Sequence, residues 1–159
     1  MIRQRRFRVG VVLSSLAALV VSGCAAVQSG SMIGSGDVVA DRQRLMKLNG
    51  ANWKDIQAKG KAGDIKAIAV NAETLALNAE HIPALFPKGS LTDKSKAKPE
   101  IWQQWDQFKR ASKNLETWAV RLRDAASDDK ADEAQAIIKD FGKEACGGCH
   151  TPFRVPPKK

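Results

Sequence analysis

The chain has 159 residues, of which 43% are hydrophobic and 27% are charged, so it is long enough for one domain with a core and too apolar for wholesale disorder. Its formal net charge is +9, but four arginines lie in the first eight residues, and residues 24–159 carry 22 basic and 17 acidic side chains. The remaining surplus of five comes without a compact basic motif interleaved with aromatic residues, so the charge does not indicate a nucleic-acid binder.

The N-terminal segment has the composition of an export signal. A basic stretch, Met1–Arg8, precedes 13 predominantly apolar residues, 9–21. As a helix they would rise about 20 Å, short of the roughly 30 Å hydrocarbon core of a bilayer. We therefore interpret residues 1–23 as a signal peptide and not as a membrane-spanning helix.

The end of this segment, Val21-Ser22-Gly23-Cys24, resembles a bacterial lipobox. The resemblance implies a lipoprotein in which the chain is cut before Cys24 and Cys24 receives the lipid; the alternative is an ordinary small-residue cleavage site. Residues 24–36 are small and polar, which predicts a flexible tether. We expect a folded domain over 37–159, facing the bacterial periplasm and held at a membrane by the lipid on Cys24.

Hydrophobic residues recur at helical spacing in four segments of this domain. The first covers about 38–59 and is closed by Gly60 and Gly63. The second opens at Asp64, a residue type that caps helix N-termini, and is stopped by Pro83.

The other two segments follow a lysine-rich connection over 83–98. The third segment starts with Pro99 in its first turn, and Ser127-Asp128-Asp129 caps the fourth, which runs to the cysteines near the C-terminus. Each of the four has one apolar stripe, and no strand pattern competes. We expect an all-α fold, an antiparallel four-helix bundle that buries the four stripes against one another.

The motif Cys146-Gly147-Gly148-Cys149-His150 matches C-x-x-C-H, the attachment motif of c-type haem. Thiols at positions i and i+3 of a helix lie on one face, where each can add across a vinyl group of the haem, and the adjacent histidine can bind the iron. The motif therefore predicts one covalent haem c, with its iron, attached near the C-terminus.

Three other chemistries compete for these cysteines. A thioredoxin-like dithiol follows a strand, and none is predicted here. A zinc site needs about four ligands, and the mature chain adds only Cys24 and His81 to the motif. A structural disulfide leaves His150 without a role.

The C-terminal position of the motif, together with two other stretches, resembles the cytochrome c′ family over about residues 37–155. The stretches are Arg42–Lys47 in the first helix and Lys98-Pro99-Glu100-Ile101-Trp102 at the start of the third. The haem motif continues as His150-Thr151-Pro152-Phe153-Arg154. The resemblance implies a four-helix bundle with a single haem.

The resemblance also implies what fills the iron's face opposite His150. In one branch of the family an apolar residue of the first helix covers a five-coordinate iron; in the low-spin branch a methionine at that position binds it. Here the position, four residues after Arg42, holds Met46, which resembles the low-spin His/Met branch. By spacing alone, Met46 is more typical of core packing.

Three further residues are assigned to the haem through this resemblance. Arg42 is expected to meet a haem propionate, with a solvated surface arginine as the alternative, and Arg154 is expected beside the haem. Trp102 is expected next to it, although large aromatics at helical spacing more often belong to a core. Pro152 is expected to bend or end the helix just past His150.

A haem held by histidine and methionine has no open position for a substrate, so the leading hypothesis is single-electron transfer without catalysis. The alternative is a five-coordinate cytochrome c′ that binds nitric oxide or carbon monoxide. A peroxidase is disfavoured, since no distal histidine is apparent. The sequence does not identify a redox partner protein. The lysine-rich 88–98 stretch is suited to an acidic one, with a plain solvated surface as the alternative, and a homodimer is left open.

Overall fold

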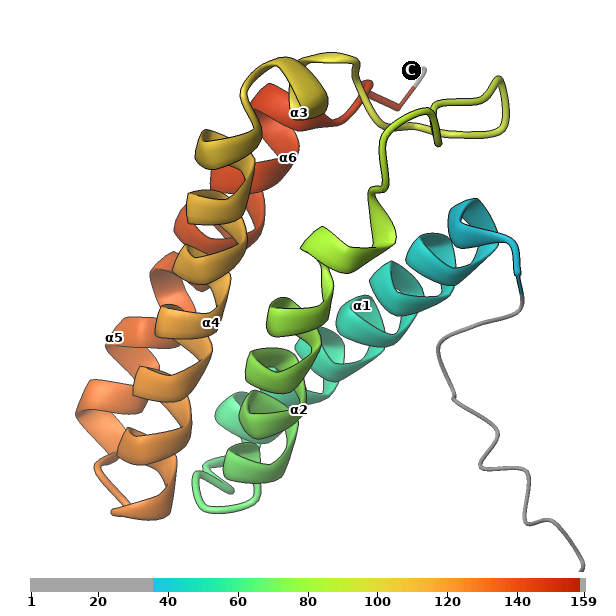
Figure 1. Cartoon of the computed structure of the whole chain (residues 1–159). Coiled ribbons are helices and arrows are strands. Elements are labelled where there is room, and N and C mark those ends of the chain that lie inside the picture. The colour runs from blue at the N-terminus through green and yellow to red at the C-terminus, as the bar shows by residue number, and fades with distance from the viewer. Residues whose placement is uncertain (1–35, 158–159) are drawn as a thin grey trace, which may run out of the picture. The chain divides into compact units, whose positions relative to one another are not determined.

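Four long helical stretches run antiparallel in the computed structural model, which describes residues 36–157 (Figure 1). In chain order the elements are α1 (Val38–Ala62), α2 (Ile68–His81), η1 (Pro83–Leu85), α3 (Glu100–Gln103), α4 (Trp105–Ser127), α5 (Ala131–Phe141), η2 (Gly142–Gly147) and α6 (Gly148–Phe153). The last three follow one another without a break and form the fourth stretch. The all-α four-helix bundle is thereby confirmed.

Residues 1–35 lie outside the described part, and with them the predicted signal peptide, Cys24 and all but the last residue of the predicted tether. Among the helices that are described, none has both the length and the apolar composition needed to cross a bilayer.

Helix α1 begins and ends for local reasons that the sequence contains. The Asp37 carboxylate accepts hydrogen bonds from the backbone N–H groups of Val39 (2.9 Å) and Ala40 (3.1 Å), which caps the helix. Gly63 ends it in the left-handed conformation, with φ +76°. Gly60, expected to help close the helix, lies inside it, where a Cβ atom would come 3.1 Å from Cδ1 of Ile138 on α5.

Two other expected boundaries were wrong, and one expected helix is interrupted. Asp64 does not cap α2, which begins only at Ile68 with Ala67 at its N-cap position. The N–H of Asp64 donates to Lys59 O and so completes the end of α1. The third stretch is interrupted at Gln104, where the backbone leaves helical geometry between α3 and α4. Ser127 still belongs to α4.

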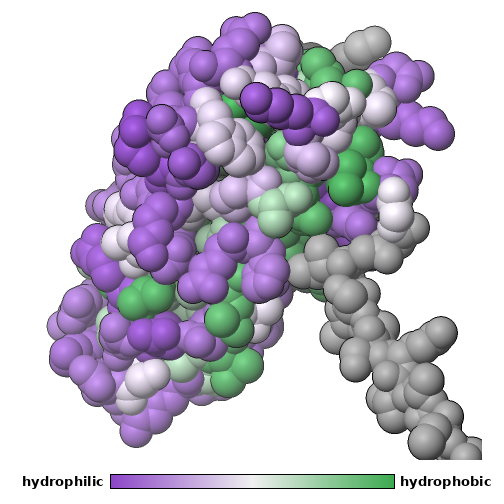
Figure 2. Space-filling view, in the orientation of Figure 1, coloured by the Kyte–Doolittle hydropathy of each residue, from purple (hydrophilic) through white to green (hydrophobic). Residues whose placement is uncertain are grey.

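The core lies between the four apolar stripes. Helix α1 packs against α2 and α5, and α4 packs against α2 and α5, which closes the ring of four. The largest fully buried side chains are Phe108, Phe141, Ile56, Ile68, Leu75, Ile101 and Leu122. Figure 2 shows the visible face as mostly hydrophilic, with hydrophobic residues in a band between the helices. Burial of each of these large core side chains contributes about 1.5–3 kcal/mol to the stability of the fold.

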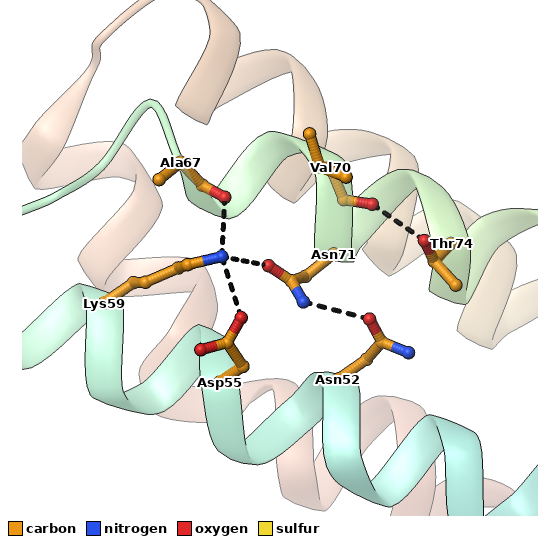
Figure 3. A network of polar contacts seen from close by, with 7 residues as sticks. All are labelled: Asn52, Asp55, Lys59, Ala67, Val70, Asn71 and Thr74. Atoms are coloured by element: carbon orange, nitrogen blue, oxygen red, sulfur yellow. Dashed lines mark hydrogen bonds and ion pairs between the residues drawn. The ribbon is translucent and has the colours of Figure 1, made fainter.

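A polar network fixes α2 against the C-terminal half of α1 (Figure 3). Lys59 Nζ donates to Asn71 Oδ1 (2.6 Å) and to Ala67 O (3.2 Å), and it pairs with Asp55 Oδ2 at 2.7 Å. Asn71 Nδ2 donates in turn to Asn52 Oδ1 (2.9 Å). These contacts set the register of the two helices at the end of the bundle away from α6 (Figure 1).

Candidate haem-binding site

A cavity of about 440 Å³ lies between α1, the connection from α2 to α3, α4 and α6, which is within the size range of cofactor sites. Its walls are largely apolar, with cationic groups among them. The lining residues are Arg42, Gln43, Met46, Lys47, Ile82, Phe86, Ser95, Lys96, Ala97, Ile101, Phe108, Cys149, His150, Phe153 and Arg154.

The C-x-x-C-H motif lies along one wall of this cavity. Cys149 and His150, both on α6, line it. Cys146 is half-buried against the core and belongs to η2, a π-helix, a form often found at functional sites. Asn114 of α4 supports this turn, since its side-chain amide donates to Glu144 O at 2.8 Å. Both thiols of the motif are free, so the structure contains no disulfide between them.

The ionisable groups of the motif are shifted toward their uncharged forms. Burial, with a smaller contribution from nearby Cys146, raises the pKa of the Cys149 thiol to about 11. Burial also raises the pKa of Cys146. Partial shielding from water, and then the charge of Arg154, lower the pKa of His150. A neutral imidazole keeps the nitrogen lone pair that an iron ligand needs.

Met46 reaches the same cavity from α1. Its side chain is half-buried and lines the cavity together with Cys149 and His150, whereas the adjacent Leu45 is buried in the core. Helix geometry separates the two neighbours, because successive residues lie about 100° apart around the axis. The cavity therefore has an imidazole on one helix and a thioether on another.

Arg42 lies one turn before Met46 and lines the cavity, but its guanidinium is directed to the connection between α2 and α3. Both terminal nitrogens donate hydrogen bonds to that segment, to Leu85, Ser90 and Ser95. Only the Nε–H group of its five N–H groups takes no part in these bonds. Hydrogen bonds within the protein therefore occupy the terminal nitrogens with which Arg42 was expected to contact a propionate.

Arg154 lines the cavity where the chain leaves α6. It is extended and exposed, and it forms an isolated antiparallel bridge with Ala97 of the connection. Lys98 N–H donates to Phe153 O (3.0 Å) and Val155 N–H to Lys96 O (2.8 Å). Helix α6 ends at Phe153, directly after Pro152, as expected from the missing N–H of proline.

Trp102 does not line the cavity. Its indole N–H donates to Phe86 O (3.0 Å) and Pro87 O (3.1 Å), so the ring packs on the outer side of Phe86. The aromatic part of the wall consists of Phe86, Phe108 and Phe153, with Phe108 4.8 Å from Phe86 and 5.4 Å from Phe153 between ring centroids.

Sequence reasoning missed all three phenylalanines as site residues. Phe108 belongs to the apolar stripe of the third helical segment, where spacing alone indicates core packing. Phe153 follows His150 by three residues on one helix, so helical spacing could have found it. Phe86 lies in an irregular connection, where no periodicity marks it.

These residues fit a haem. The lining offers two groups of the attachment motif, apolar and aromatic walls, and the cations of Lys47, Lys96 and Arg154 to complement propionate groups; it includes no carboxylate among the described residues. Nowhere in residues 36–157 do three or more His, Cys, Asp or Glu side chains form a cluster able to hold a metal ion, so the zinc alternative finds no ligand set there.

The bundle and its C-terminal motif define a c-type cytochrome with one covalently attached haem c. The family model described as Cytochrome C′ matches residues 37–154, and the chain belongs to that family.

The chain is similar to cytochrome c-556 of Agrobacterium fabrum, with 33% identity over 146 residues that cover 90% of this chain and 96% of that protein. It is 32% identical to cytochrome c′ of Pararhodospirillum photometricum over 71% of this chain and 92% of that protein. Among solved structures, a nitric oxide complex of a cytochrome c prime variant from Alcaligenes xylosoxidans superposes with a TM-score of 0.68 at 26% identity, covering 77% of this chain and 96% of that one.

Proposed function

We propose that this cytochrome carries single electrons through a haem attached to Cys146 and Cys149 and held between His150 and Met46. One observation carries the proposal: the half-buried Met46 lines the same cavity as His150 and Cys149. The Met46 thioether and the His150 imidazole would then hold the iron together and leave no position for an external ligand.

The division of roles follows from the side chains. Bound haem iron supplies the one-electron chemistry, and a thioether ligand favours its reduced state. The His150 imidazole would bind the iron, the aromatic and aliphatic walls would exclude water, and the cations at the cavity would offset the propionate charge. Because His150 and Met46 both lie on helices, a change of oxidation state would require little movement of the protein.

A second candidate function is binding of a small gas by a five-coordinate iron. The comparisons favour it over the His/Met reading, since several similar solved structures are nitric oxide complexes of cytochrome c prime from Alcaligenes xylosoxidans. In this case Met46 would be part of the packing that covers the iron's second face and would not bind it.

Absorption spectra of the purified holoprotein decide between the two. A pyridine haemochrome assay first establishes haem c. A low-spin ferric form with a methionine-to-iron charge-transfer band supports electron transfer. A high-spin spectrum that changes readily with carbon monoxide supports gas binding instead.

The place of action is proposed on the family and the N-terminal sequence. Cytochromes of the c′ family are periplasmic. The lipobox-like sequence before Cys24 supports attachment to a membrane on that side, and a redox partner protein would meet the chain there. A homodimer also remains a proposal, which the mass of the holoprotein in solution would test.

A further inference from the structure

The segment 85–95 connects η1 to the residues before α3 and forms part of the cavity wall. Phe86 and Ser95 of this segment line the cavity. Its own backbone bonds are few: Ser90 N–H donates to Pro87 O (3.2 Å) and Ser95 N–H to Thr92 O (2.9 Å). A wall with so few internal bonds depends on contacts to other elements for its position.

Arg42 of α1 provides four of those contacts. Gln43 adds a hydrogen bond to Lys94 O (3.0 Å), and the Trp102 indole donates to Phe86 O and Pro87 O. Nη1 of Arg42 donates to Leu85 O (3.3 Å) and Ser90 Oγ (3.1 Å). Nη2 donates to Ser90 O (2.7 Å) and Ser95 Oγ (2.8 Å). The guanidinium carbon also lies 4.7 Å from the centroid of the Phe86 ring. One side chain thus contacts the segment at its beginning, middle and end.

The shape of the guanidinium matters in this contact. The four acceptors are carbonyl and hydroxyl oxygens, and Arg42 is only 4% exposed. The planar guanidinium forms a fork of N–H donors that can bond to acceptors spread along a segment, whereas the ammonium group of a lysine is a compact point charge. Ser90 is buried as well, so loss of the fork would leave buried oxygens without donors.

We propose that Arg42 is a positioning residue of the haem site, which holds segment 85–95 in place and thereby limits access of small ligands to the cavity side lined by Met46. It acts on the haem through Phe86 and Ser95, and not chiefly as a partner of a propionate. The inference rests on the haem cavity alone and holds for either candidate function.

Amide hydrogen exchange of the holoprotein tests the effect on the segment. Arg42→Lys keeps the charge and loses the fork, so exchange in peptides covering 86–98 is expected to become at least tenfold faster, while peptides from α4 stay unchanged. Lys54→Gln, which removes an exposed charge elsewhere on α1, is the matched control and is expected to leave segment exchange within twofold of the original.

Ligand access is measured separately. In a Met46→Leu background, dissociation of a methionine thioether from the iron cannot limit the rate of carbon monoxide binding. In that background, Arg42→Lys is expected to speed carbon monoxide binding to the ferrous protein severalfold. The comparison is between the Met46→Leu protein and the double variant that also carries Arg42→Lys. It therefore stays valid if Met46 proves not to bind iron and the proposed electron-transfer function fails.

A serine pair supplies a second variant that leaves Arg42 in place. Ser90→Ala with Ser95→Ala is expected to speed exchange of the segment in the same direction but less, because two backbone acceptors remain. Combined with Arg42→Lys, the effects are expected to be non-additive. The proposal is overturned if Arg42→Lys and the serine pair leave exchange within twofold of the original, or if Arg42→Gln changes only the pH dependence of the reduction potential, as a propionate partner would.

Discussion

Met46 on α1 and His150 on α6 line one cavity, so residues near the two ends of the folded domain contribute to the same site. We expect Met46→Leu to leave the bundle intact, because the volumes are similar and such exchanges usually cost under about 1.5 kcal/mol. Without the thioether, the ferrous iron should become high-spin, bind carbon monoxide faster and show a lower reduction potential. Visible spectra, stopped-flow mixing and a redox titration measure these changes.

The control for this exchange is Leu48→Met, which makes the reverse substitution at an exposed position of the same helix. It should alter neither spectrum nor potential. An unmodified protein that is already high-spin, and that Met46→Leu leaves unchanged in its carbon monoxide binding, would make gas binding the preferred function.

Variants of the attachment motif should separate covalent linkage from iron ligation. Cys146→Ser and Cys149→Ser each allow at most one thioether, so the yield of holoprotein should fall, as a pyridine haemochrome assay and intact mass would show. His150→Ala should lose the proximal ligand even where thioethers form. Since haem binds only the native bundle, apoprotein should also unfold at lower denaturant. Equal stability of apoprotein and holoprotein would contradict a haem inside the cavity.

Phe141→Ala should weaken the bundle without changing the haem. Phe141 is fully buried and stacks on Trp53 with ring centroids 4.9 Å apart, but it does not line the cavity. Its truncation should reduce the free energy of unfolding by about 3–5 kcal/mol. Leu77→Ala at a half-exposed position should stay within about 0.5 kcal/mol. Denaturation followed by circular dichroism gives both values; a shifted haem spectrum in Phe141→Ala would argue against this division.

The Asp55–Lys59 pair should stabilise the fold only above acidic pH. The hydrogen bond from Lys59 lowers the pKa of Asp55 below its ordinary value. A carboxyl group with a lowered folded-state pKa stabilises the fold above its unfolded pKa and loses that contribution as pH falls through the folded value. Asp55→Asn should therefore lower Tm at pH 7, and the difference should shrink below about pH 4.

Asp64→Asn is the matched control for that experiment, because Asp64 is exposed near the same end of α1 and outside the network of Figure 3. Comparison of the two variants separates loss of the Asp55–Lys59 contact from loss of one negative charge in general. A Tm difference for Asp55→Asn that is constant from pH 7 to pH 3 would mean that the carboxylate charge does not contribute.

Cys24→Ser should release the protein from the membrane if Cys24 carries a lipid. If Cys24 is lipidated, the unmodified protein should enter the detergent phase together with membranes, since acyl chains add about 0.8 kcal/mol of membrane-binding free energy for each buried methylene group. The variant should be soluble or poorly processed. Identical recovery of both as soluble protein would leave only an ordinary cleavage site.

Features that depend on a few neighbouring residues could be predicted from the sequence. The four apolar stripes, the C-terminal end of α1 at Gly63 and the C-x-x-C-H motif each follow from spacing or backbone preference within a short window. The same local rules misplaced the start of α2, because both a helix end and a helix start can use the Gly63-Asp64 pair. Only the closing bond from Asp64 N–H to Lys59 O distinguishes them.

The cavity wall was decided by tertiary structure. Arg42 was assigned to a propionate through family resemblance, and that contact stays a prediction; the fold also brings Ser90 and Ser95 within hydrogen-bond distance of its guanidinium. Trp102 was expected beside the haem; it packs against Phe86 and does not line the cavity, whereas Phe86 does. A sequence records which residues can form a helix or bind a haem. Contacts between distant segments arise only when the apolar stripes pack, since packing then determines which side chains share a wall.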